Sequence, residues 1–376
     1  MRAAGIIFSN LNDNTLSRLT STRTVAAIPF ACRYNLVDFP LSCMVNSGIT
    51  DVNIIANYNF RSLAEHLGSG KDWDLARRSG GIRLISPYQT STSAHASMYS
   101  HHLEALRSMY EYIAECKEDT IVLSDCTDIC NIDLKTVIAR HLETDADVTF
   151  VTKPCEDGFT SKMPVMMLSS DEHDHVSGIA FSARFLASHP KRFINLYVMK
   201  TNYLIRLLDD AFAYNYTSMS RDVFLNRPEE KKYYVYSYGG YVAPVSSFLD
   251  YYKHSIELTE KPEGMRELLL NRQRPVLTHV HNSAPTAYRS DAVVKSSLIA
   301  DDCEIEGRVE NSILFRGVKI GRGAVVRNCV LFAGTEVGAN ANLNCVVSDR
   351  NVKVTESCVL SGSKQLPFYI PIDRTV

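Results

Sequence analysis

A six-residue periodicity near the C-terminus is the feature that most restricts how this chain can fold. Apolar residues recur every six positions in three groups, Ile299 and Ile305, then Ile320, Val326 and Phe332, then Val337 and Leu343. Glycine, asparagine and aspartate lie between them, and the register slips between the groups. Such repeats predict a left-handed parallel β-helix, in which each repeat forms one flat side of a triangular coil. The aliphatic residues then stack in an internal column, while glycine and asparagine take the corners. Antiparallel strands joined by turns are the alternative.

The preceding residues have a different pattern, in which short β-branched runs alternate with helical periodicity. Strands are expected at residues 5–8, 52–56, 120–123, 148–152, 193–199 and 233–238. Helices are expected at residues 62–67, 99–115, 134–142, 203–215 and 245–257. This alternation predicts a doubly wound, largely parallel sheet whose ligands bind at the carboxyl ends of the strands.

The two patterns divide the chain into three segments. Residues 1–258 are predicted to form the α/β domain, and residues 291–376 the β-helix with a C-terminal tail. Residues 259–290 are predicted to be a linker, because Pro262, Gly264, Pro275 and Pro285 interrupt any regular periodicity there.

Composition excludes several classes of partner. The chain has 40 Lys plus Arg against 42 Asp plus Glu, so it has no excess of basic charge and a nucleic-acid partner is not expected. No apolar stretch approaches the roughly 20 residues of a membrane span, and no targeting segment is apparent. Ten cysteines are scattered without a metal-binding spacing. We therefore expect a cytoplasmic protein with no membrane contact.

Several segments carry a resemblance to a known family. They are LTSTR (19–23), IPF (28–30), VDF (37–39), VNSGI (45–49), SD (124–125), SRD (220–222) and NSIL (311–314). Their order and identity resemble the glucose-1-phosphate adenylyltransferases (ADP-glucose pyrophosphorylases). The resemblance implies a nucleotidyltransferase-type (GT-A/Rossmann-like) domain followed by the β-helix.

The residues that this family uses to bind phosphates are largely missing. The family has a GGxGxRL loop after the first strand, and the corresponding segment of this chain begins at Asn10. In that segment Asp13 would add negative charge next to the phosphates, and Thr15 takes the place of the arginine. No glycine is left to let the backbone approach a pyrophosphate. The lysine of the KPA segment is Val25, and His95 replaces the aspartate of the sugar-binding GTADA stretch. The loop is therefore interpreted as degenerate.

The magnesium site that the resemblance implies is also incomplete. Asp125 matches one of the family's two metal aspartates, whereas the second position is Pro244. Asp125 is therefore a vestigial ligand, or merely a turn or capping residue. Asn57, Tyr197 and Asp222 are vestigial candidates for nucleotide binding. No cofactor is expected, and magnesium only if residual nucleotide binding survives.

Three functions are compatible with this pattern. The resemblance is strongest to the D-type subunit of bacterial glycogen synthesis, a catalytically impaired paralogue, which implies a regulatory subunit in a hetero-oligomer, expected as a tetramer, with a catalytic glucose-1-phosphate adenylyltransferase. The alternatives are an active enzyme with atypical site residues and a hexapeptide-repeat acyltransferase. The acyltransferase ranks last because no histidine follows His281.

Three cations are candidates for binding a phosphorylated small-molecule effector. They are Arg23, Arg33 and Lys200, each of which could equally be surface charge. His101 and His102 are adjacent on a predicted helix, so they point to different faces and are not expected to bind a metal together. We expect them to be solvated or packed.

Overall fold

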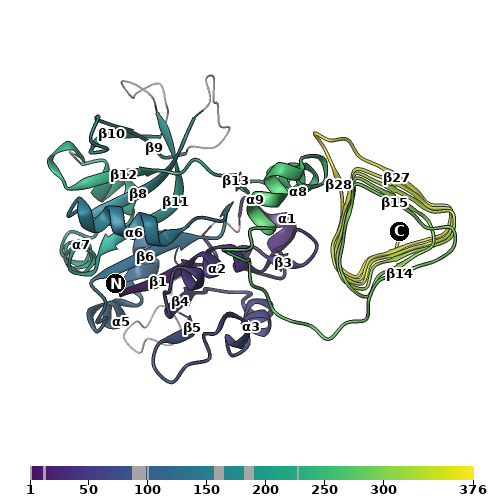
Figure 1. Cartoon of the computed structure of the whole chain (residues 1–376), viewed down its shortest axis with the longest axis horizontal. Helices are drawn as coiled ribbons and strands as arrows, with labels where there is room; N and C mark the ends of the chain where they lie inside the picture. The colour runs from purple at the N-terminus through teal and green to yellow at the C-terminus, as the bar shows by residue number, and fades with distance from the viewer. Residues whose placement is uncertain are drawn as a thin grey trace.

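The computed structural model describes residues 2–11, 14–86, 99, 101–155, 165–181, 190–226 and 228–376. Figure 1 shows two parts, an α/β domain and a β-helix that appears as a triangle when viewed along its axis. Helices α1 (Ser17–Thr20), α8 (Phe248–Glu260) and α9 (Pro262–Leu269) lie between the two parts. The predicted fold class is confirmed.

A nine-stranded sheet forms the centre of the α/β domain. Its strands are β1 (Ala3–Phe8), β4 (Asp51–Ile55), β5 (Gly81–Ile85), β6 (Thr120–Asp125), β8 (Val148–Pro154), β9 (Met167–Ser170), β10 (Val176–Ala180), β11 (Lys191–Lys200) and β12 (Tyr233–Ser237). The order is β10-β9-β11-β6-β1-β4-β5, with β8 paired to β11 and β12 to β8. All six predicted strands are present in this sheet.

The expectation of a largely parallel sheet holds for only part of it. Strands β1, β4, β5 and β6 are parallel, but β11 runs antiparallel to β6, β8 and β9, and β9 pairs antiparallel with β10. The sheet is therefore mixed. Hydrophobic periodicity identifies a strand but carries no information on its direction, which depends on partners far away in the sequence.

Helices cover the sheet largely where they are expected. The remaining ones are α2 (Asp38–Asn46), α3 (Arg61–Leu67), α4 (His102–Arg107), α5 (Tyr110–Ala114), α6 (Leu134–Glu143) and α7 (Thr201–Ala213). The single helix predicted at 99–115 is instead two, α4 and α5. Helix α2 was not predicted, and Pro40 is tolerated in its first turn because those N–H groups need no helical partner. Helix α9 lies inside the predicted linker.

Helix α6 buries a histidine against the sheet. The His141 side chain is fully buried, and its Nδ1 lies 2.8 Å from the Thr149 hydroxyl on β8. Burial, with a smaller contribution from Lys200, lowers the pKa of His141 from 6.5 to about 4. The folded protein therefore holds this imidazole neutral.

This burial predicts a pH dependence of stability. Between pH 6.5 and 4 the unfolded chain protonates His141 and the folded chain does not, so the free energy of unfolding should fall with falling pH, by up to about 3 kcal/mol. Urea denaturation at several pH values would measure it. His141→Gln should lose that part of the pH dependence, whereas His173→Gln, at a side chain that is 82% exposed, should keep it. An unchanged slope in His141→Gln would contradict the assignment.

The C-terminal part is a left-handed parallel β-helix with three flat sides. The first side contains β14 (Ala287–Tyr288), β17 (Glu304–Ile305), β20 (Lys319–Ile320), β23 (Glu336–Val337) and β26 (Lys353–Val354). The second contains β15 (Val293–Lys295), β18 (Arg308–Glu310), β21 (Val325–Arg327), β24 (Asn342–Asn344) and β27 (Val359–Ser361). The third contains β16 (Leu298–Ile299), β19 (Ile313–Leu314), β22 (Val330–Leu331), β25 (Val346–Ser348) and β28 (Phe368–Ile370).

The internal column is largely the predicted one. Ile305, Ile320 and Val337 are in register on successive coils of the first side and are buried. Corner residues have left-handed backbone conformations, for example Gly323 with φ +70° and Asn340 with φ +53°. These two observations confirm the hexapeptide interpretation.

Phe332 is the exception in the column, because its side chain lies outside the coil. Leu331, one residue earlier, belongs to the interior cluster instead. Phe332 packs in the core of the α/β domain, with its ring centroid 5.1 Å from that of Phe315 and 6.2 Å from that of Tyr251 on α8. The prediction that Phe332 lies inside the β-helix was wrong. Apolar character alone cannot distinguish a residue buried between two domains from a residue buried inside the coil.

The third side of the β-helix shares a core with the α/β domain. Its outward residues Ile313, Val330 and Val347 are fully buried against that domain. The Tyr252 hydroxyl on α8 also donates to the Asn328 carbonyl over 2.8 Å. All ten cysteines are free thiols. None of the helices in the described residues has the length and apolar character that a membrane span needs.

Candidate functional site

The candidate site lies where β1, β4 and β6 end side by side. Asn10 lies two residues after the end of β1, and its Oδ1 accepts hydrogen bonds from Ser9 Oγ at 2.8 Å and from the Asn57 N–H at 2.9 Å. Its Nδ2 donates to the Tyr58 carbonyl at 3.2 Å. The Asn10 side chain thus joins the ends of β1 and β4, and it gives Asn57 a structural partner. Thr15 is exposed.

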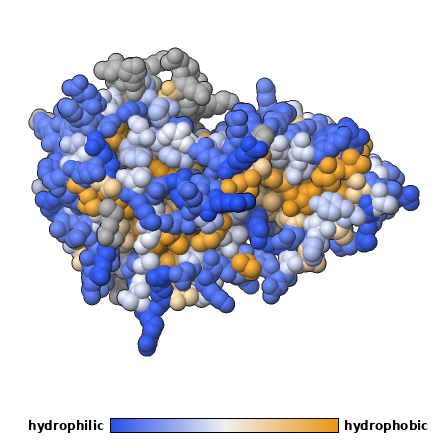
Figure 2. Space-filling model, in the orientation of Figure 1, coloured by the Kyte–Doolittle hydropathy of each residue, from blue (hydrophilic) through white to orange (hydrophobic). Residues whose placement is uncertain are grey.

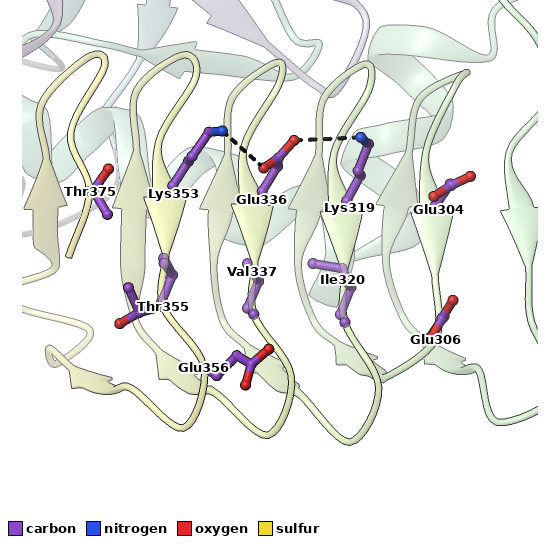
Figure 3. Close-up of a pocket in the computed structure, with 13 residues that line it drawn as sticks. Glu304, Glu306, Lys319, Ile320, Glu336, Val337, Lys353, Thr355, Glu356 and Thr375 are labelled. Carbon is purple, nitrogen blue, oxygen red and sulfur yellow. Dashed lines mark hydrogen bonds and ion pairs between the residues drawn. The ribbon is translucent and has the colours of Figure 1, made fainter.

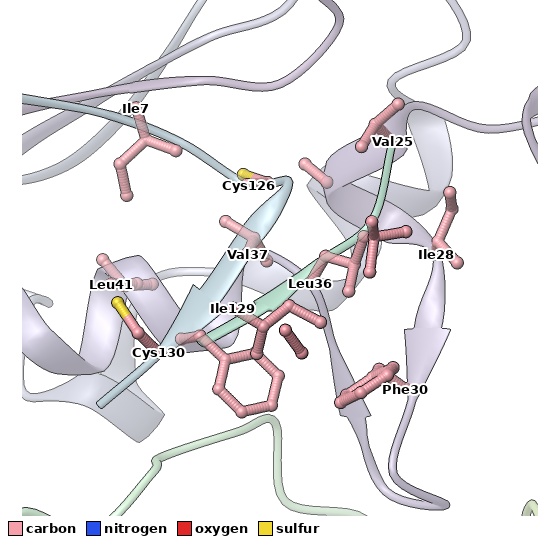
Figure 4. Packing of buried hydrophobic residues seen from close by; sticks show 14 of the residues in the cluster. Ile7, Val25, Ile28, Phe30, Leu36, Val37, Leu41, Cys126, Ile129 and Cys130 are labelled. Atoms are coloured by element: carbon pink, nitrogen blue, oxygen red, sulfur yellow. The ribbon is translucent and has the colours of Figure 1, made fainter. Parts of the chain in front are cut away.

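Two of the predicted positions, Asp13 and His95, lie outside the described residues. Val25 is described, and it lies in a 3-10 turn (Val25–Ala27) that follows α1. It is 3% exposed and belongs to the apolar cluster that also contains Ile7 and Cys126 (Figure 4). A valine that faces a hydrocarbon core offers a phosphate neither a charge nor a hydrogen bond.

Asp125, at the carboxyl end of β6, already has a hydrogen-bond partner within the protein. Its Oδ1 lies 2.8 Å from His102 Nε2, and the two side chains are 4% and 22% exposed. His102 begins α4 and packs edge-on against Phe8, with ring centroids 4.7 Å apart. Sequence reasoning missed this pair, because the two positions are 23 residues apart in the chain and no sequence pattern connects them.

Pro244 lies beside the segment that leaves β6. It is the last residue of β13 (Val242–Pro244), which pairs antiparallel with β7 (Asp128–Cys130) and places Pro244 opposite Asp128. The next residue, Val245, donates its N–H to the Thr127 carbonyl at 2.7 Å. Position 244 is therefore at the Asp125 end of the sheet, as the resemblance implies, but a proline supplies no ligand.

The neighbouring carboxylate does not replace the missing one. Asp128 accepts from Arg192 Nη1 at 2.7 Å and from Asn195 Nδ2 at 2.8 Å, so both its oxygens are bonded. Within the described ranges no three His, Cys, Asp or Glu side chains are grouped as a metal site would require. Since magnesium binds through carboxylate oxygens, the residues described here do not fit it.

The other two nucleotide-site candidates have structural roles. Tyr197 is 2% exposed, and burial raises its pKa well above 10. It packs among aromatic rings that include Phe150 and Phe193. Asp222 instead accepts the N–H groups of Ser218 and Thr217 at 2.9 and 2.8 Å, and these bonds lower its pKa. It caps its own turn and does not join Asp125.

The expected effector cations are also mostly occupied. Arg23 is only 1% exposed, and its Nη2 forms an ion pair with Asp349 Oδ1 at 2.6 Å. Lys200 pairs with Asp145 at 2.6 Å. Arg23 is therefore too buried to contact an effector, whereas Lys200 is 30% exposed and Arg33 is exposed, so effector binding by these two stays a prediction.

Comparison with known proteins agrees with both halves of the fold. A nucleotidyl transferase model matches residues 12–162, and a GlmU-like C-terminal hexapeptide model matches residues 282–365. The glycogen biosynthesis protein GlgD of Bacillus subtilis (strain 168) is 33% identical over 372 residues, covering 97% of this chain and 94% of the relative. The protein of that name from Geobacillus stearothermophilus is 34% identical over 86% of this chain and 82% of its own length.

Catalytic relatives are more distant. The glucose-1-phosphate adenylyltransferase of Thermosipho melanesiensis is 28% identical over 86% of this chain and 77% of its own length. The chain belongs to the GlgD branch of the glucose-1-phosphate adenylyltransferase family.

Proposed function

We propose that the protein is a regulatory subunit, non-catalytic or weakly catalytic, that modulates ADP-glucose synthesis for glycogen in complex with a catalytic glucose-1-phosphate adenylyltransferase. The observation that carries this proposal is the state of the metal position. Asp125 is hydrogen-bonded to His102, and Pro244 stands where the resemblance places the second metal carboxylate.

The chemistry of nucleotidyl transfer explains why a missing metal ligand is strong support for a non-catalytic role. When a nucleotidyl group is transferred from a nucleoside triphosphate to a sugar phosphate, negative charge is spread over phosphate oxygens in the transition state. Catalysis therefore depends on cations and N–H groups that are positioned around these oxygens. Removing one such preorganised group typically costs about 10²- to 10³-fold in rate. This chain lacks the second carboxylate at Pro244 and the lysine at Val25, and Thr15 carries no charge.

A surface suited to a partner exists at the C-terminal end of the β-helix. Figure 2 shows that hydrophobic residues reach the surface of the β-helix. Val359, Leu366 and Phe368 are 71%, 70% and 44% exposed. Strands β27 and β28 are the last in their sheets, and the tail covers only β26, through bonds such as Lys353 N–H to the Arg374 carbonyl.

Uncovered strand edges and apolar side chains favour association with another subunit. A groove of 620 Å³ at this end is lined by Arg18, Gly362, Leu366 and Phe368, among others. Arg18 is on α1, next to the degenerate loop, so a subunit bound here would contact both domains. Such binding regulates if it favours the active conformation of the catalytic subunit.

The test is to mix the protein with the catalytic subunit of the same organism. We expect a mixed oligomer by size-exclusion chromatography with light scattering at micromolar concentration. We also expect a change of about 5- to 150-fold in apparent affinity for substrate or effector, the usual range of allosteric coupling. A mixture that elutes as separate species with unchanged kinetics would refute the proposal.

A matched pair of variants locates the contact. Leu366→Glu places a charge in the exposed apolar end and should weaken the mixed oligomer. Leu270→Glu makes the same change at another exposed leucine, 59% exposed and following α9, and should not. Equal effects of both variants would show that the contact lies elsewhere.

A further inference from the structure

The first side of the β-helix carries a row of exposed charges that alternate in sign. On successive strands the outward residues are Glu304, Lys319, Glu336 and Lys353. Figure 3 shows these four side chains in one line along the coil axis. Their side chains are 49%, 55%, 43% and 64% exposed, so they are accessible to a partner.

A second row runs parallel to the first, on the other side of the internal column. It consists of Glu306, Gly321, Gly338 and Thr355, which directly follow the four strands. The two glycines leave the middle of this row without side chains. Together the rows line a shallow groove of 680 Å³.

We propose that two copies of this chain associate through this side, with their β-helices antiparallel. The two-fold axis passes between β20 and β23. It places Glu304 opposite Lys353 of the second copy and Lys319 opposite Glu336 of the second copy, with both pairs occurring twice. In the second row it places Glu306 opposite Thr355 and Gly321 opposite Gly338.

The order of charges selects this arrangement. Read in one direction the row is acid, base, acid, base, and read in the other it is base, acid, base, acid. An antiparallel copy in this register therefore meets an opposite charge at every position, whereas a parallel copy meets a like charge. An interface that a two-fold axis relates to itself must have this self-complementarity.

Contacts within one chain account for only part of the row. Glu336 lies 3.5 Å from both Lys319 and Lys353, as cross-strand neighbours do. Glu304 instead pairs with Arg289 at 3.4 Å. Coils are stacked about 4.8 Å apart, so Glu304 and Lys353, three strands apart, are about 14 Å from each other in one chain. Only a second copy brings them together.

The contact should be weak and sensitive to salt. The side presents five short strands and exposed ion pairs, and salt screens such pairs. We expect a monomer–dimer equilibrium in the micromolar range at low ionic strength, measured by sedimentation equilibrium of the purified chain. A chain that stays monomeric at about 500 µM in low salt would overturn the proposal.

A charge exchange tests the pairing itself. Lys353→Glu should raise the dissociation constant at least about tenfold, because two attractive pairs become repulsive. Adding Glu304→Lys should restore it to within about threefold, although this double variant breaks the pairs of both residues with Arg289 and Glu336 inside the chain. Lys295→Glu, the same charge change on the second side, should leave dimerisation unchanged. Failure of the double variant to restore dimerisation would overturn the proposed axis.

Chemical cross-linking tests the same contact in the wild-type protein, so its result does not depend on whether a variant folds. A carbodiimide joins a carboxylate to an amine without a spacer. In a mixture of unlabelled and isotope-labelled protein it should couple Glu304 of one copy to Lys353 of the other. Absence of this mixed cross-link, while the neighbouring Glu336–Lys353 link forms, would refute the contact. These outcomes do not depend on the catalytic subunit, so they stand apart from the test of the proposed function.

Discussion

Replacing Asp349 by alanine is expected to lower the free energy of unfolding by about 3–5 kcal/mol, because it leaves a charged guanidinium without a counter-ion inside the protein. Arg23 and Asp349 have side chains that are 1% and 0% exposed, and they lie 2.6 Å apart. The Arg350 N–H at 2.7 Å and the Tyr369 hydroxyl at 3.0 Å also donate to Asp349. Within the described structure Arg23 Nε and Nη1 have no hydrogen-bond partner. The loss of Asp349 would therefore remove the main compensation of the Arg23 charge.

Urea denaturation of the wild type and two controls measures this effect. The first control, Asp291→Ala, removes the carboxylate of an exposed pair with Arg322 and should cost less than about 1 kcal/mol. The second, Asp349→Leu combined with Arg23→Met, removes both charges and should recover most of the lost stability, since hydrophobic residues can replace a buried ion pair. A cost below about 1 kcal/mol for Asp349→Ala would contradict the buried-pair argument.

The same ion pair shows what the sequence could not reveal. From the sequence, Arg23 is a candidate either for binding an effector or for surface charge. Its partner is 326 residues away in the chain, on a different domain. A local pattern cannot report such a contact, and only the docking of the β-helix onto the α/β domain buries both groups. This pair therefore links the segment after the degenerate loop to the β-helix.

Features that repeat locally were predictable. Ile320 and Val326 lie in the internal column as their six-residue spacing required, and glycine and asparagine occupy corners. Asp125 also lies at the end of an apolar strand, as its position in the sequence indicated. Its pairing with His102 was not predictable, since it depends on how α4 packs beside the sheet.

The largest expected effect concerns catalysis. The purified chain alone should form ADP-glucose from glucose 1-phosphate and ATP at least about 10⁴-fold more slowly than a catalytic family member, since two missing groups at 10² each already give this factor. Such losses combine less than multiplicatively when the groups act together, but this site has also lost its glycine loop, so we expect a loss of about this order. A coupled assay of pyrophosphate release measures it. A turnover of about 1 s⁻¹ or more would refute the prediction.

Restoring ligands tests whether their loss is the cause. Pro244→Asp alone should not recover magnesium-nucleotide binding, because Asp125 remains bonded to His102. Combined with His102→Ala it frees both carboxylates, and titration calorimetry should then detect binding that His101→Ala with Pro244→Asp does not give. Val25→Lys is unsuited to this purpose, because Val25 is packed among apolar residues and an unpaired ammonium there would destabilise the domain. The outcome that would contradict this argument is equal affinity for magnesium-nucleotide in Pro244→Asp and in Pro244→Asp with His102→Ala. It would show that the bond to His102 does not prevent Asp125 from binding a metal.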